Sequence, residues 1–386
     1  MRLTRRVLLT AAFVALSGLL VFAADKYYDL LFLFYPSVCR EIQGYLAAWS
    51  AGFDFVIWQR ALLILAILVV VTLIICILRK KNVLGWLFGW TTAASVALFL
   101  YMLLWGINLY SPSIAVDLRM EVADSYSSTQ LQEAAQYYLE SANALASRVD
   151  RDETGLCKTE SFADTAAKVG SGFQNMTRTC YVFGGSTEAP KELGWSNILK
   201  TSGITVPFTG EVNVNPDLLP VTMPFVMSKQ VALRMSIAPE EDASFAAILA
   251  CMASDDITYQ YSGYYMAYVY LYHALDNTNA AKTAHITQNL NQDLQADLIA
   301  NGTLEGESAR GYMTISGDER DSVADNTVAD LLVAWYIKQT TPVEEAEEES
   351  THGAEVVPAP EEAMNQNALA QAAENETAAS GDEPTE

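Results

Sequence analysis

The chain has 386 residues, 51% of them hydrophobic, and its formal net charge is -23. Such an acidic balance argues against nucleic acid as a partner, because binding the phosphate backbone needs clustered Lys and Arg. The length allows two or three domains, and the composition indicates a membrane protein with an acidic soluble part.

Three apolar runs near the N-terminus each approach the roughly 20 residues that a helix needs to cross a bilayer. They cover residues 7–24, 61–78 and 84–104. Basic residues precede the first run and follow the second, so the positive-inside rule places both of these flanks in the cytoplasm. We therefore predict a transmembrane helix or signal anchor at 1–24, an extracytoplasmic loop at 25–60, and two transmembrane helices at 61–108.

The first run has a second interpretation. Val21-Phe22-Ala23 has the small-x-small pattern that signal peptidase cleaves, so the run is either a lasting anchor or a cleaved signal peptide. Both interpretations give the same topology, with the C-terminal part of the chain outside the cytoplasm.

Residues 109–340 are expected to form one mainly α-helical extracytoplasmic domain, long enough for a sizeable core. Thr129 with Gln132 fits a capping box that would start a helix running toward Val149. Asp150–Gly194 is glycine-rich and is expected to be irregular. Further helices are predicted at Ala243–Ala253, Tyr259–Leu275, Ala280–Ala300 and Ser322–Ile337.

The tail at 341–386 differs from the rest of the chain. From residue 342 onward it contains no Lys or Arg and is rich in Glu, Ala, Pro, Asn and Gln. Such a segment buries too little apolar surface to offset the entropy of ordering it. We predict a disordered acidic tail.

The most informative stretch lies between Pro207 and Phe245. It starts as a turn-rich extended segment with several prolines and glycines. From about Thr222 apolar residues recur at helical spacing, which predicts a helix. A second helix is expected to begin at the acidic cluster around Glu240, since carboxylates suit a helix N-terminus.

This stretch resembles the domain of unknown function 3810 family of bacterial membrane proteins. The family pattern is PFTGE-x-NVN, then a PF…HExxH helix, then E-x-E-A-N-F. Residues 207–211 and 213–215 match its first block, Pro224-Phe225 opens the second, and residues 240–245 are similar to the third. The resemblance implies a zincin-like domain that binds zinc and acts as a peptidase.

The zinc motif itself is degenerate in this chain. The HExxH pentad falls on residues 229–233, where Lys229 and Leu233 replace the two histidines and Gln230 replaces the glutamate. HExxH works because two imidazoles one turn apart reach a single Zn²⁺ and the Glu serves as general base. A lysine repels the metal, a leucine offers no lone pair, and a glutamine cannot take a proton. We expect no zinc cofactor and no catalytic residues at this helix.

Other positions of the pattern are retained. The resemblance implies that Glu240 is the remnant of a third metal ligand, although a solvated helix N-terminus is the favoured explanation, since the other ligands are missing. The candidate residues for a cleft that binds a peptide or glycan are Glu211, Asn213, Asn215 and Tyr261. Tyr261 belongs to a tyrosine-dense helix for which core packing is the alternative explanation.

Several other polar residues are weaker candidates for a site. His273 and His285 flank a turn, and a two-histidine metal site there competes with ordinary surface positions; His352 lies in the tail. Ser228 precedes Lys229, but adjacent residues on a helix point apart, which argues against a Ser/Lys dyad. Cys157 and Cys180 bracket the glycine-rich region in a compartment that permits a disulfide, and their pairing is left open.

Two functions of different classes are consistent with the sequence. The first is a membrane-anchored, non-catalytic relative of a zinc-peptidase-like family, which binds or scaffolds a peptide or envelope protein beside the lipid bilayer. The second is a metal-dependent hydrolase that uses carboxylates instead, with Glu211, Glu240 and Asp242 around a hard cation. Loss of the motif favours the first.

Overall fold

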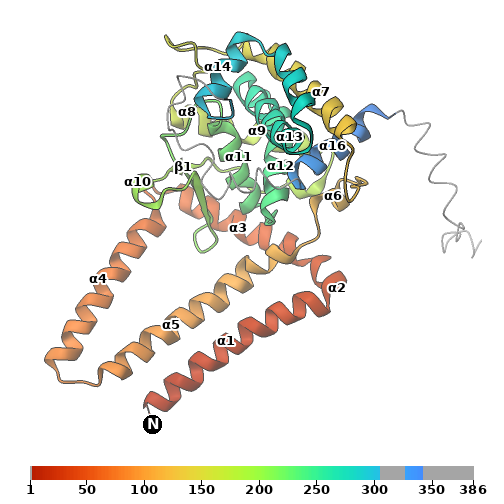
Figure 1. Cartoon of the computed structure of the whole chain (residues 1–386). Helices are drawn as coiled ribbons and strands as arrows, with labels where there is room; N and C mark the ends of the chain where they lie inside the picture. Colours follow the sequence, from red (N-terminus) through yellow and green to blue (C-terminus); the bar gives the residue numbers. More distant parts are fainter. Residues whose placement is uncertain (1, 305–326, 342–386) are drawn as a thin grey trace, which may run out of the picture. The chain divides into compact units, whose positions relative to one another are not determined.

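The computed structural model describes residues 2–304 and 327–341. The chain divides into two units, Met1–Tyr336 and Ile337–Glu386. The predicted acidic tail lies outside the described residues, apart from Thr341. Figure 1 shows a mostly helical protein with three long N-terminal helices, so the expectation of a membrane protein with a helical domain is confirmed.

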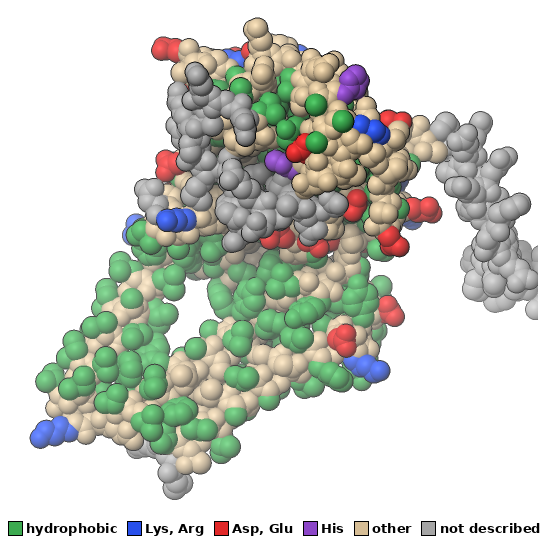
Figure 2. Space-filling model, viewed as in Figure 1, with side chains coloured by type: hydrophobic (Ala, Val, Ile, Leu, Met, Phe, Trp, Pro, Cys, Tyr) green, Lys and Arg blue, Asp and Glu red, His purple; other side chains and the backbone are tan. Residues whose placement is uncertain are grey.

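Three helices are long and apolar enough to cross a membrane: α1 (Arg2–Lys26), α4 (Ile57–Leu78) and α5 (Val83–Leu104). Apolar side chains cover their surfaces, whereas most of the charged side chains lie on the rest of the molecule or at the helix ends (Figure 2). Helices α1 and α5 lie side by side, and the hydroxyls of Thr10 and Thr92 hydrogen-bond across the pair at 2.9 Å. The pairing gives the Thr10 hydroxyl a partner, while the Thr92 hydroxyl also bonds the carbonyl of Phe88 in its own helix at 2.6 Å.

The segment expected as an extracytoplasmic loop at 25–60 is largely helical. It contains α2 (Tyr28–Phe32) and α3 (Tyr35–Ala51), and α4 begins at Ile57. One face of α3 is buried, with polar side chains among the apolar ones. Arg40 Nε donates to the carbonyl of Met235, and Gln43 Nε2 donates to that of Pro207, at 3.1 and 3.0 Å. The polar residues of α3 thus satisfy carbonyls of the domain instead of facing water, and the extracytoplasmic placement of this segment stays a prediction.

The domain core is built from helices. Tyr138 on α7 packs against Tyr264 on α13, and Phe225 on α11 packs against Tyr270 on α13. The larger helices of this part are α7 (Ser128–Ala146), α11 (Met223–Arg234), α12 (Glu240–Met252), α13 (Ile257–Ile286), α14 (Gln292–Ala300) and α16 (Thr327–Thr340). The shorter ones are η1 (Gly106–Tyr110), α6 (Ile114–Asp117), α10 (Ser196–Leu199) and η3 (Thr287–Asn289).

The glycine-rich region expected to be irregular contains several short elements. These are α8 (Phe162–Ala167), α9 (Gly170–Thr177), η2 (Tyr181–Phe183) and β1 (Lys191–Glu192). Gly172 explains part of this order. A Cβ at this position would lie 1.8 Å from the carbonyl oxygen of Ala250, so glycine lets α9 pack directly on the backbone of α12.

A small sheet adjoins α11. Its strands are β1, β2 (Gly203–Val206) and β3 (Glu211–Val214), in the order β1-β3-β2. Strand β3 pairs parallel with β1 and antiparallel with β2, with Ile204 opposite Asn213. The extended segment predicted from Pro207 onward therefore supplies the turn and the second strand of a hairpin, and this strand is central in the sheet.

Two helix predictions need correction. The capping box of α7 is formed by Ser127 and Gln130, whose side chains bond each other's backbone N–H, and not by Thr129 and Gln132. Both pairs fit the same four-residue pattern, so the pattern alone does not select the register. The predicted helix at 280–300 is interrupted: α13 is kinked at Asn279 and ends at Ile286, and α14 begins after an intervening turn.

Candidate functional site

Helix α11 carries the degenerate pentad. Pro224 stands in its first turn, where a missing backbone N–H costs nothing. Almost every side chain of the helix is buried, because α12, α13 and the hairpin surround it. Polar residues on such a helix must find partners within the protein.

Lys229 forms an ion pair with Glu240, the carboxylate that the sequence resemblance suggested as the remnant of a metal ligand. Its Nζ lies 3.0 Å from Oε1 of Glu240, the first residue of α12. The Lys229 side chain is 3% exposed and that of Glu240 is 56% exposed. The buried ammonium therefore contacts the carboxylate oxygen that a metal ion at this site would need as a ligand.

The other two altered positions also contribute to internal packing. Gln230 Oε1 accepts a hydrogen bond of 3.0 Å from the hydroxyl of Thr205 on β2. The backbone carbonyl of Leu233 accepts one of 2.8 Å from the indole N–H of Trp105, which follows the third apolar helix. The pentad thus joins α11 to the hairpin and to the end of α5.

These residues do not fit a zinc ion. A catalytic zinc needs three protein ligands with lone pairs, and this helix offers a cation, an amide and an alkyl group. Within residues 2–304 and 327–341, no group of three or more His, Cys, Asp or Glu side chains is placed to hold a metal.

The carboxylates of the alternative cation site have separate partners. Glu211 accepts hydrogen bonds from the backbone N–H groups of Ile57 and Trp58, at 2.9 and 3.1 Å, and pairs with Lys191 Nζ at 3.2 Å. It therefore caps the N-terminus of α4, where a negative charge is favoured. The sequence offered no signal for this role, since the capped residues lie far away along the chain.

Asp242 lies in the first turn of α12 and is buried. Its Oδ1 accepts a hydrogen bond of 2.7 Å from the hydroxyl of Ser113. Burial raises the pKa of Asp242 to about 6, while the bonds from Ser113 and from the backbone of Ile114 act in the opposite direction. The sequence indicated Asp242 as part of an acidic helix N-terminus or as a metal ligand, and neither role predicts this buried environment.

The two asparagines proposed for a cleft lie in or beside β3. Both are buried. The Asn215 side chain accepts the backbone N–H of Asp217 at 3.0 Å, a local turn that starts the segment leading to α11. Both polar side-chain atoms of Asn213 lack a hydrogen-bond partner within the described part of the chain. The structure places these side chains in the interior and not along an open cleft.

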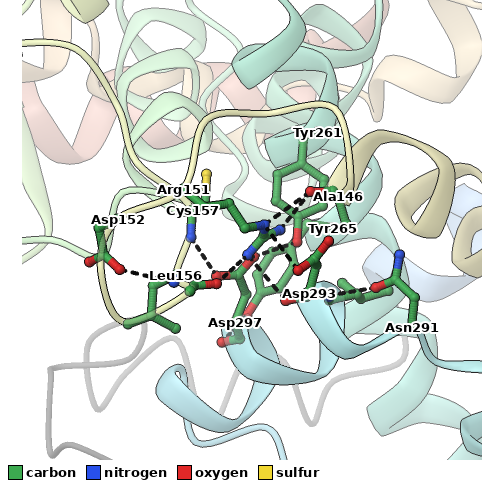
Figure 3. A network of polar contacts seen from close by, with 12 residues as sticks. Ala146, Arg151, Asp152, Leu156, Cys157, Tyr261, Tyr265, Asn291, Asp293 and Asp297 are labelled. Atoms are coloured by element: carbon green, nitrogen blue, oxygen red, sulfur yellow. Dashed lines mark hydrogen bonds and ion pairs between the residues drawn. The ribbon is translucent and has the colours of Figure 1, made fainter.

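Tyr261, the fourth cleft candidate, belongs to a buried polar network (Figure 3). Its hydroxyl donates to Asp297 Oδ2 at 2.6 Å. Asp297 also accepts from Arg151 Nη1 at 3.1 Å and from the Cys157 N–H at 2.9 Å. The network joins α13, α14 and the loop after α7, so core packing, the alternative explanation, accounts for Tyr261.

The remaining candidates are not gathered into one site. The ring of His273 packs against Tyr272 with centroids 5.4 Å apart, His285 is exposed, and His352 lies outside the described residues. The hydroxyl of Ser228 accepts from the thiol of Cys251 at 3.3 Å. This contact turns Ser228 toward α12 and agrees with the argument against a Ser/Lys dyad.

No disulfide links Cys157 and Cys180 in the described structure. The amide of Cys157 is held by Asp297, and the thiol of Cys180 donates to the carbonyl of Asp117 at 3.6 Å. Both side chains are buried. The compartment argument permitted the bridge, but the fold attaches the two cysteines to different elements.

Comparison with known proteins gives one match. A family model described as "Protein of unknown function (DUF3810)" matches residues 33–312. No curated protein and no solved structure matches the chain. The matched region includes α3, two of the apolar helices, the hairpin and helices α11 to α14.

Proposed function

Because the chain belongs to this family of unknown function, which the sequence analysis associated with a zincin-like domain, we propose that it is a non-catalytic member. In this proposal the domain keeps a zincin-like framework and serves as a membrane-anchored binding or scaffolding unit. Its partner is a peptide or a protein of the cell envelope. The domain lies on the extracytoplasmic side, which the basic flanks of the first two apolar helices support.

The Lys229–Glu240 ion pair is the observation that carries this proposal. In an HExxH site the corresponding positions supply an imidazole and a carboxylate to the same metal. Here an ammonium 3.0 Å from the carboxylate neutralises it without a metal. A zinc ion at this carboxylate would meet the repulsion of a buried cation, whose removal from water is already costly.

The other two substitutions support the same conclusion. The side-chain oxygen of Gln230 accepts a hydrogen bond from Thr205 on β2. The glutamine that stands where HExxH has its general base therefore contributes to internal packing. Leu233 contributes a carbonyl to Trp105 and no ligand atom. The side chains of Lys229 and Gln230 thus have interactions suited to a packed helix, whereas the bond at Leu233 involves only its backbone.

No observation favours the carboxylate-based hydrolase. Glu211 caps α4, Glu240 pairs with Lys229, and Asp242 bonds Ser113. A hard cation would require these oxygens to converge and to give up their present partners.

The test is peptide hydrolysis by the full-length protein in detergent with added zinc. We expect a rate equal to the background for the wild type and for Gln230→Glu, because a general base has no metal-bound water to serve. The triple change Lys229→His, Gln230→Glu and Leu233→His restores the motif and is the matched comparison. Zinc-dependent hydrolysis by the wild type that disappears in Glu240→Ala would contradict the proposal.

A further inference from the structure

A pocket of about 90 Å³ lies where the domain meets the segments next to the membrane helices. Its walls come from α2 and α3, from residues 111–117 after α5, and from the loop between α11 and α12. Lys229 and Glu240 do not line it, so the pocket is separate from the degenerate motif. Its volume suits a small polar group and is too small for a folded peptide segment.

One wall carries a buried cation. Arg40 is 9% exposed, and its guanidinium donates to the carbonyls of Met235 and Tyr181 at 3.1 and 3.3 Å. Within the described residues, no carboxylate lies within ion-pair distance of Arg40. Neutral carbonyls and the ring of Tyr181 surround the guanidinium, and the carboxylate of Asp117 acts on it only at longer range, so the positive charge can attract an anion.

The same pocket is lined by a buried hydroxyl that lacks a hydrogen-bond partner. Ser236 is 4% exposed, lines the pocket, and its Oγ has no hydrogen-bond partner in the described part of the chain. Its φ of 69° lies in the left-handed region, which non-glycine residues rarely adopt. Strained backbone and an orphaned buried hydroxyl at a pocket wall are typical of a ligand site.

The same pocket also has an acidic side. Asp242 and Asp117 both line it. Asp242 is 2% exposed and accepts hydrogen bonds from the Ser113 hydroxyl and the backbone of Ile114, while Asp117 accepts the phenol of Tyr181 at 3.0 Å. A purely anionic ligand would be repelled by two carboxylates. A ligand with an anionic and a cationic end meets both sides of the pocket.

We propose that this pocket binds the headgroup of a phospholipid that carries both a phosphate and a primary ammonium. The phosphate contacts Arg40 and Ser236, and the ammonium contacts Asp242 and Asp117. A lipid is favoured over a soluble zwitterion by position, because Phe32 lies on α2, which follows α1, and Pro112 lies just after η1, which follows α5. Such segments lie at the depth of the lipid headgroups.

Native mass spectrometry of the full-length, delipidated protein tests this proposal. We expect retention of phosphatidylethanolamine at least about tenfold above phosphatidylcholine, whose quaternary amine donates no N–H bond, and above phosphatidylglycerol, which has no amine. Equal retention of the three lipids would overturn the proposal. Equally tight binding of soluble glycerophosphoethanolamine would overturn the assignment to a lipid.

Two variants locate the site. Ser236→Gly removes the hydroxyl and relieves the left-handed strain, so the fold is kept, and we expect phosphatidylethanolamine retention to fall several-fold. Asp242→Asn should remove the preference for phosphatidylethanolamine over phosphatidylglycerol. Lys200→Gly is the control, since Lys200 also has a left-handed φ, of 51°, and does not line the pocket. Unchanged retention in Ser236→Gly, or an equal loss in Lys200→Gly, would contradict the assignment.

Discussion

Lys229 shows how one substitution changes what a carboxylate does. Its ammonium is buried while Glu240 is half-exposed, so the carboxylate keeps access to water and the cation does not. Removing the carboxylate would leave a buried charge without this partner, which costs more than the pair itself contributes. The pair is therefore a structural element, with a measurable energetic coupling.

A double-mutant cycle on full-length protein in detergent tests this coupling. We expect Glu240→Gln to lower the free energy of unfolding by about 1–2 kcal/mol, a value reduced by the exposure of Glu240. Lys229→Met in the same chain should recover part of that loss, because it removes the buried charge. Glu241→Gln, at an exposed neighbouring position, is the control and should change stability by less than about 0.5 kcal/mol. Additive effects of the two substitutions would refute the coupling.

Asp242 gives a prediction about pH. Its folded-state pKa of about 6 lies above the ordinary value of 3.8, so the folded protein binds the proton more tightly than the unfolded chain. The resulting stabilisation is fully present below about pH 4 and is lost as the pH rises through about 6. In lipid-free detergent, Asp242→Asn should raise the unfolding temperature at pH 7 by a few degrees and flatten its change between pH 4 and 7. A wild-type profile that is already flat over this range would contradict the prediction.

At the scale of elements, α3 joins the membrane part to the domain. The turn between β2 and β3 packs against this helix, and Gly210 occupies the turn with a φ of 65°. A Cβ at Gly210 would lie 2.5 Å from the backbone N of Ala47 and 2.9 Å from the backbone C of Leu46. The glycine of the PFTGE segment is therefore required by the close approach of α3 as well as by its own dihedral angle.

Gly210→Ala should lower the free energy of unfolding by about 3 kcal/mol, because backbone atoms cannot give way as a flexible side chain would. Gly155→Ala is the matched control. Gly155 also has a positive φ, of 79°, but a Cβ there meets nothing within 4 Å. We expect the control to cost about 1 kcal/mol, the backbone contribution alone. Chemical denaturation of both variants checks the difference, and equal losses would show that the contact with α3 contributes nothing.

Elements that depend on a local pattern were easier to predict from the sequence than contacts between distant segments. The apolar helices, α11, and the start of α12 at Glu240 follow from hydropathy and helix-end signals. The helix α3 was missed because its buried face contains Arg40 and Gln43. Such polar residues are expected to be exposed unless the carbonyls that they bond are known. The role of Glu211 was missed for the same reason, since the backbone N–H groups of Ile57 and Trp58 that it caps precede it by more than 150 residues.

For the candidate site, the sequence identified the altered pentad but not what replaces the metal. The residue types of Lys229, Gln230 and Leu233 were enough to argue against zinc ligation. Their contacts with Glu240, Thr205 and Trp105 depend on how α11, α12 and the hairpin pack, which no local pattern encodes. Tyr261 shows the converse, because a tyrosine that resembled a cleft residue lies in a buried network.

At the scale of the whole molecule, the orientation in the membrane is a separate prediction. The basic flanks before α1 and after α4 favour a cytoplasmic location for both, and hence an extracytoplasmic C-terminal part. In intact cells or spheroplasts, added protease should digest the chain after Lys338. Protection of that part until the membrane is breached would contradict the predicted topology.

The central claim is that the altered pentad leaves this family member without a zinc site. Elemental analysis of the full-length protein, purified without chelators, tests it most directly. We expect zinc well below one equivalent per chain and the same content in Glu240→Ala, since the carboxylate is neutralised by Lys229. About one tightly held zinc per chain that is lost in Glu240→Ala would contradict the account.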